Sequence, residues 1–155
     1  MASDFEFLSP TDKPALLAIS SPELHLFSRN ALMELGYKVQ SAATHDEFMT
    51  RFTSVPYHMV VMEDSFASIG ADENGSLRAI QLLPMAQRRH ATFVLVGATL
   101  QTMNTMQAFQ QSVHGVVHPA DAAKLKLILQ QIAADNAIFT GVYRDIQNRI
   151  AQGKT

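Results

Sequence analysis

The sequence predicts an α/β domain built on a doubly wound, five-stranded parallel sheet, with helices on both faces and an extended last helix. Short apolar runs alternate along the chain with longer stretches in which apolar residues recur every three or four positions. The apolar runs are continuous, as expected of strands that are covered on both faces of a parallel sheet. The 155 residues contain no segment long enough to act as a linker, which favours a single folded unit.

The first half of the chain is expected to contain three strands and two helices. The strands are the apolar runs Ala15–Ile19, Tyr37–Ala43 and His58–Met62. Between the first two runs, apolar residues at helical spacing predict a helix that ends at Gly36, because glycine readily adopts the left-handed conformation that follows many helices. A short second helix, marked by Phe48, Met49 and Phe52, should end before Pro56.

The second half continues this alternation. A polar loop is expected over residues 63–75, followed by a helix that ends or bends at Pro84. Two further strands, Thr92–Val96 and Gly115–Val117, should flank a helix from about Thr102 to Ser112.

The last helix is longer than a compact domain of this kind needs. It should start after Pro119, with Asp121 as its cap, and run to Ala151. Its apolar stripe consists of Leu125, Ile128, Ile132, Phe139, Val142 and Ile146. Such a stripe forms a coiled-coil seam or packs on its own domain. We expect a helical dimer contact.

The composition excludes several function classes. The absence of cysteine excludes disulfides, thiol nucleophiles and thiolate metal sites, and the net charge of −2 gives no reason to expect nucleic acid or an anionic membrane as partner. No nucleotide-binding glycine motif, apolar run of membrane-spanning length or signal-peptide pattern occurs, so we expect a cytoplasmic protein. His114 and His118 are four residues apart, but we expect structural roles for them and no metal site.

Ligands of an open parallel sheet bind beyond the carboxyl ends of its strands. Those positions are held here by Ser20 and Ser21, Glu63 and Asp64, Gly97 and Ala98, and His118.

The strands and these flanking residues resemble the receiver domain of bacterial two-component response regulators. The similar segments are Ile19-Ser20-Ser21-Pro22-Glu23-Leu24, Val60-Val61-Met62-Glu63, Val94-Leu95-Val96-Gly97-Ala98 and Gly115-Val116-Val117-His118-Pro119. The resemblance covers roughly Ala15 to Ala134 and implies the strand order 2-1-3-4-5. It divides the chain into an N-terminal arm (1–14), a receiver-like domain (15–134) and an extension of the last helix (135–155).

Departures from the family's pattern predict that the phosphorylation chemistry is lost. In the family, carboxylates hold Mg²⁺, an aspartate attacks the phosphoryl group, and a hydroxyl and a lysine bind its oxygens. The corresponding residues here are, in that order, Ser20 and Ser21, Glu63, Gly97 and His118. We therefore expect no enzyme activity, no metal and no cofactor.

Three alternatives concern the same positions. Asp64 could be an atypical acceptor if the strand register shifted by one, but neighbouring side chains of a strand point to opposite faces. Glu63 could imitate a phosphorylated aspartate, although we expect it to be a solvated strand-end residue. Gly97, and Gly115 at the position of the family's aromatic switch residue, would leave room for a small molecule.

An uncharged stretch predicts an interaction surface. No Asp, Glu, Lys or Arg occurs between Arg89 and Asp121, although the helix in this stretch must have one face in water. That helix carries Met103, Met106 and Phe109, a composition typical of interface cores. The alternative is that it is a polar, uncharged helix that faces solvent. In receivers the corresponding face is the usual dimer or partner surface. We expect a phosphorylation-independent adaptor or scaffold of bacterial signalling, homodimeric, that contacts protein partners through this face and the last helix.

Overall fold

The computed structural model describes residues 12–67, 74–84 and 90–151, with only the backbone for residues 139–148 and 151. It contains the predicted five-stranded parallel sheet, with strands in the order β2-β1-β3-β4-β5. The strands are β1 (Pro14–Ala18), β2 (Lys38–Ser41), β3 (Met59–Glu63), β4 (Thr92–Val96) and β5 (Gly115–Val117). The fold class and the strand order predicted from the sequence are therefore confirmed.

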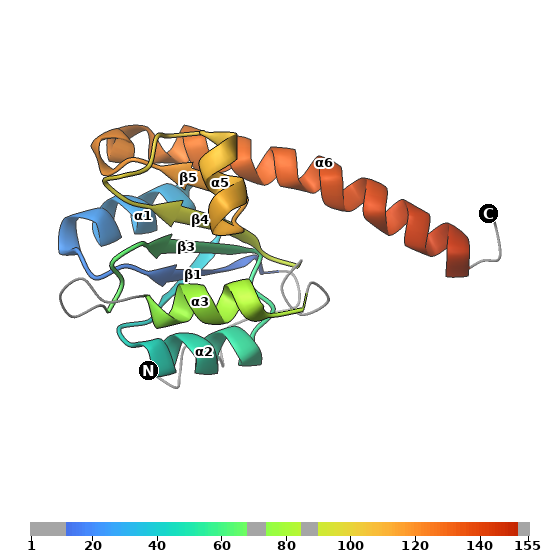
Figure 1. Ribbon diagram of the computed structural model, residues 1–155, viewed down its shortest axis with the longest axis horizontal. Coiled ribbons are helices and arrows are strands. Elements are labelled where there is room, and N and C mark those ends of the chain that lie inside the picture. Colours follow the sequence, from blue (N-terminus) through green and yellow to red (C-terminus); the bar gives the residue numbers. More distant parts are fainter. Residues whose placement is uncertain (1–11, 68–73, 85–89, 152–155) are drawn as a thin grey trace.

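Helices cover both faces of the sheet (Figure 1). One face carries α1 (Pro22–Glu34) and α6 (Leu125–Ala151), and the other carries α2 (His45–Ser54), α3 (Gly75–Leu82) and α5 (Thr105–Gln111). Two cores form because successive side chains of a strand point to opposite faces of the sheet. In β3, Val60 packs against the layer of α2, α3 and α5, and Val61 packs against the layer of α1 and α6. Every residue of β1 and β4 is buried, which explains their continuous apolar sequences.

Local signals end most helices where the sequence predicts. Gly36 follows α1 with a φ of +90°, a conformation that favours glycine. The side chain of Thr44 caps α2 by accepting a hydrogen bond from the Glu47 amide, and α2 ends before Pro56. Helix α3 ends at Leu82, two residues before Pro84, so the predicted break is confirmed.

Two predicted helix starts are wrong. Helix α5 begins at Thr105 and not near Thr102, because Met103 has a φ of +65° and the Asn104 side chain caps the helix by accepting from the Gln107 amide. The last helix is preceded by a separate 3₁₀ helix, η2 (Pro119–Lys124), and α6 begins at Leu125. Asp121 lies inside η2 and accepts a hydrogen bond from the Thr102 hydroxyl instead of capping α6.

Helix α6 is the longest element and continues past the sheet (Figure 1). Its 27 residues span about 40 Å. Leu125, Leu129 and Ile132 anchor its first half in the core, and the Asn136 amide donates to the Thr92 hydroxyl over 2.8 Å. The side chains of Phe139, Val142 and Ile146 lie outside the described part of the structure. Within the described segments, no helix is both long and apolar enough to cross a membrane.

Candidate functional site

The predicted site residues meet at the carboxyl edge of the sheet. Glu63 is the last residue of β3 and pairs in register with Val96 of β4, which in turn pairs with Val117 of β5. Backbone hydrogen bonds continue beyond the strands, from the Asp64 amide to the Val96 carbonyl (2.8 Å) and from the Gly97 amide to the Val117 carbonyl (3.0 Å). The ends of β1, β3, β4 and β5 thus form one continuous edge.

The Glu63 carboxylate is held by the loop between β1 and α1. Its Oε1 accepts hydrogen bonds from the amides of Ser20 (2.9 Å) and Ser21 (3.2 Å), and its Oε2 accepts from the Ser21 hydroxyl (2.6 Å). Ser21 precedes the first turn of α1, where a negative charge is also favoured by the helix dipole. Glu63 is a half-buried strand-end residue, and three donors of its own chain bind its carboxylate, which the sequence did not predict.

The segment after β3 is tied to the same loop. The Ser20 hydroxyl accepts from the Ala67 amide (2.9 Å), and the Asn74 side-chain amide donates to the Glu63 carbonyl (3.0 Å). Asn74 also caps α3 by accepting from the Leu77 amide. Sequence reasoning missed Asn74, although an asparagine before a predicted helix is a recognisable cap signal.

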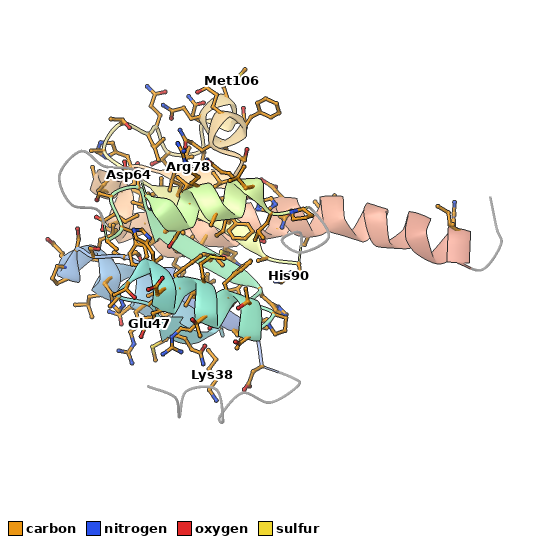
Figure 2. The ribbon with its side chains drawn as sticks, turned by 60° about the horizontal axis from the view of Figure 1, so that its bottom comes forward. Lys38, Glu47, Asp64, Arg78, His90 and Met106 are labelled. Atoms are coloured by element: carbon orange, nitrogen blue, oxygen red, sulfur yellow. The ribbon has the colours of Figure 1, made fainter. Side chains whose placement is uncertain are left out.

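The Asp64 side chain occupies the space above Gly97. A Cβ atom at position 97 would lie 2.3 Å from the Asp64 Oδ2, so any larger residue there would clash with this carboxylate. Burial raises the pKa of Asp64, the amide of Ser65 opposes this by hydrogen bonding, and the nearby charge of Glu63 raises it further. Asp64 lines a cleft of about 290 Å³ beside α3, together with Arg78 and Thr99 (Figure 2).

His118 takes part in a cap and in a cross-link between loops. Its Nδ1 accepts a hydrogen bond from the Ala120 amide (2.9 Å), which places the ring as the N-terminal cap of η2. Its backbone amide donates to the Thr102 hydroxyl (2.9 Å), and that hydroxyl donates to Asp121. The link between Thr102 and Asp121 carries no sequence signal, because the two residues are 19 positions apart and meet only in the fold.

Gly115 makes room for α6. A Cβ atom at position 115 would lie 2.3 Å from the Cδ1 of Ile132, so the space of the missing side chain is filled. The small-molecule alternative assumed that Gly97 and Gly115 leave one vacant site. That assumption is wrong, because Asp64 and Ile132 occupy the two spaces. A separate cleft of about 280 Å³ lies between α5 and α6, next to Gly115.

His114, one of the two histidines whose spacing suggested a metal site, has a structural role. The Nδ1 of His114 accepts from the Phe93 amide (2.8 Å), and the rings of these two residues are stacked with their centroids 6.1 Å apart. In the part of the chain that the structure describes, no three His, Asp or Glu side chains come together as a metal site requires.

The uncharged helix exposes its apolar residues as a stripe. On α5 and the turn before it, Met103 is 40% exposed, Met106 63% and Phe109 80%. Met106 projects from the outer side of α5 (Figure 2). Large contiguous patches of exposed apolar side chains are typical of interaction sites.

Known structures share this architecture. Neither a protein-family model nor a curated protein sequence matches the chain. A CheY-like response regulator receiver domain protein from Methanospirillum hungatei JF-1 superimposes with a TM-score of 0.61 at 12% identity, over 81% of this chain and 97% of that one. The chain has the receiver fold. A response regulator from Burkholderia pseudomallei, whose crystal structure contains a phosphorylated aspartic acid, calcium and citrate, gives a TM-score of 0.56 at 19% identity, over 92% of this chain and 86% of that one.

A longer protein contains the same receiver-like unit. NtrX from Brucella abortus, in a complex with ADP, gives a TM-score of 0.67 at 13% identity. The match covers 91% of this chain and 30% of NtrX, so this receiver-like chain spans less than a third of that protein. Identities this low establish the shared fold alone.

Proposed function

We propose that this receiver-like domain is a phosphorylation-independent, non-enzymatic adaptor or scaffold of bacterial signalling, which dimerises through α5, β5 and α6. The observation that carries the proposal is the state of Glu63, the residue at the acceptor position. Its carboxylate is engaged by Ser20 and Ser21 as a structural link between β3 and α1.

The remaining groups at this edge also favour a structural role. An acyl phosphate would need a cation and phosphate-binding donors beside a carboxylate that is free to attack. The loop after β1 offers neutral serines, Gly97 has no hydroxyl, and the His118 ring binds its own helix turn. Phosphorylation of the Glu63 Oε2 would displace the Ser21 hydroxyl, and phosphorylation of its Oε1 would displace the amides of Ser20 and Ser21.

The exposed surface supports the interaction part of the proposal. Met106 and Phe109 on α5, which carries no charged residue, and Met103 in the turn before it are exposed apolar residues. Depletion of charge with enrichment of Met and aromatic residues is the composition of interface cores. With the site closed to phosphoryl chemistry, contact with other protein chains is the activity that this surface can provide.

Incubation with acetyl phosphate and Mg²⁺ tests the first part of the proposal. Intact-mass spectrometry should detect no phosphoryl adduct, while a receiver that has an acceptor aspartate gains one under the same conditions. A stable adduct that disappears in Glu63→Gln would overturn the proposal.

A second candidate function is phosphorylation at Asp64. What favours it is that the Asp64 carboxylate lines an open cleft, whereas Glu63 is held by three donors. The same experiment distinguishes the two residues. An adduct that survives Glu63→Gln and disappears in Asp64→Asn would identify the chain as an atypical acceptor.

A further inference from the structure

The cleft between α5 and α6 is apolar at its base. Ala108, Gly115 and Ile132 are buried there, and Thr105 and Asp135 lie on opposite sides of its rim. Gly115 and Ile132 line the cleft, next to the filled space above Gly115. A cavity of about 150 Å³ is enough to hold a benzene ring. The volume of about 280 Å³ is therefore sufficient for one aromatic side chain.

The aromatic residue nearest to this cleft in sequence points out of it. Phe109 follows the cleft residue Ala108 on α5, yet 80% of Phe109 is exposed. No residue from His90 to Ala120 carries a formal charge, apart from any charge on the histidines. Among the described residues, Asp135 is the one acidic or basic residue other than histidine that lines the cleft, so a partner with a charged surface would gain little here, whereas two copies can meet through their uncharged α5 helices.

We infer that Phe109 of each copy inserts into the α5–α6 cleft of a second copy. This inference rests on the proposed dimer and identifies its central contact. A two-fold interface requires the projecting group and its receptor on the same surface, and Phe109 and the cleft meet that requirement. Helix α6 forms one wall of the cleft and continues outward with Ile138 exposed, so the same two-fold arrangement brings the helical extensions together.

Sedimentation velocity over a concentration series tests this contact. The wild-type chain should form a dimer, and Phe109→Ala should raise the dissociation constant at least about a hundredfold, because two aromatic contacts are lost per dimer. Leu26→Ala is the matched control. Leu26 is 58% exposed on α1, in the opposite layer, and its substitution should leave the dissociation constant unchanged.

A complementation experiment tests the pairing itself. Thr105→Trp places a large side chain at the rim of the cleft and should block insertion, whereas Phe109→Ala leaves the cleft open. Each variant alone should be monomeric. Their mixture should form a heterodimer at least about tenfold tighter than either homodimer, since one of the two contacts is restored. A cooperative thermal unfolding transition in both variants would show that they are folded.

The outcomes separate the inference from the proposed function. A wild-type dimer that is unaffected by Phe109→Ala, or a mixture that gains nothing, would overturn this contact while the dimer stands. A monomeric wild-type chain would overturn the contact and the proposed dimer together. The phosphorylation part is measured independently by mass and is unaffected by either result.

Discussion

Among individual residues, Glu63 should contribute to stability although it stands at the acceptor position. Glu63→Ala leaves the amides of Ser20 and Ser21 without their acceptor and should lower the free energy of unfolding by about 1 to 3 kcal/mol. Glu34→Ala is the control, because Glu34 forms only an exposed ion pair of 3.7 Å with Lys126 and should change stability by less than about 1 kcal/mol. Urea unfolding of both variants measures the difference. Equal, small losses would contradict the structural role of Glu63.

The second residue-level prediction concerns Asp64 and pH. Burial, reinforced by the charge of Glu63, raises the pKa of Asp64 in the folded protein despite the opposing hydrogen bond from Ser65. The folded state then holds this proton more tightly than the unfolded state. This contribution therefore makes unfolding easier as the pH rises through the ordinary carboxyl pKa to the raised one.

Asp64→Asn removes the free-energy cost of holding an ionised carboxylate at position 64 in the folded state. The variant should be more stable than the wild type at neutral pH, and the two should converge at about pH 3, where the unfolded carboxyl is largely protonated. Urea unfolding at both pH values measures this. A variant less stable than the wild type at neutral pH would show that the ionised Asp64 carboxylate is stabilising in the folded state.

At the level of elements, the contact between β5 and α6 depends on the absence of a side chain at position 115. Gly115→Ala would place a Cβ atom 2.3 Å from Cδ1 and 2.7 Å from Cγ1 of the buried Ile132 and should destabilise the fold by about 1 to 3 kcal/mol. Ile132→Val removes the nearer atom. The double variant should therefore be more stable than the sum of the two single effects predicts. Additive effects would mean that β5 and α6 adjust freely to each other.

The elements also show which features can be predicted from sequence. The strands were predictable because continuous apolar runs and the glycine and proline residues around them are local signals. The start of α5 was not predictable, because Met103 adopts a left-handed conformation that is uncommon for methionine. The partners of Glu63 lie 43 and 42 positions away in the sequence, so its engagement depends on the fold. The same holds for Asp64 above Gly97 and for Ile132 above Gly115.

In the whole molecule, the carboxyl edge of the sheet differs from the surface formed by α5 and α6. Hydrogen bonds fasten Glu63 to the loop before α1, and His118 to Thr102 and to the first turn of η2. Apolar surface is exposed instead on α5, and α6 carries the chain away from the domain (Figure 1).

Removal of residues 138–155 separates folding from association. The truncated chain keeps Leu125, Leu129 and Ile132 in the core and the Asn136–Thr92 hydrogen bond, so its free energy of unfolding as a monomer should change by less than about 1 kcal/mol. Its dimer should dissociate at least about tenfold more readily in sedimentation experiments, because the two helical extensions no longer meet. If the truncated chain associated as tightly as the full chain, α6 would contribute nothing to the dimer. If it failed to fold, the extension would belong to the domain itself and could not serve as a free contact for a second copy.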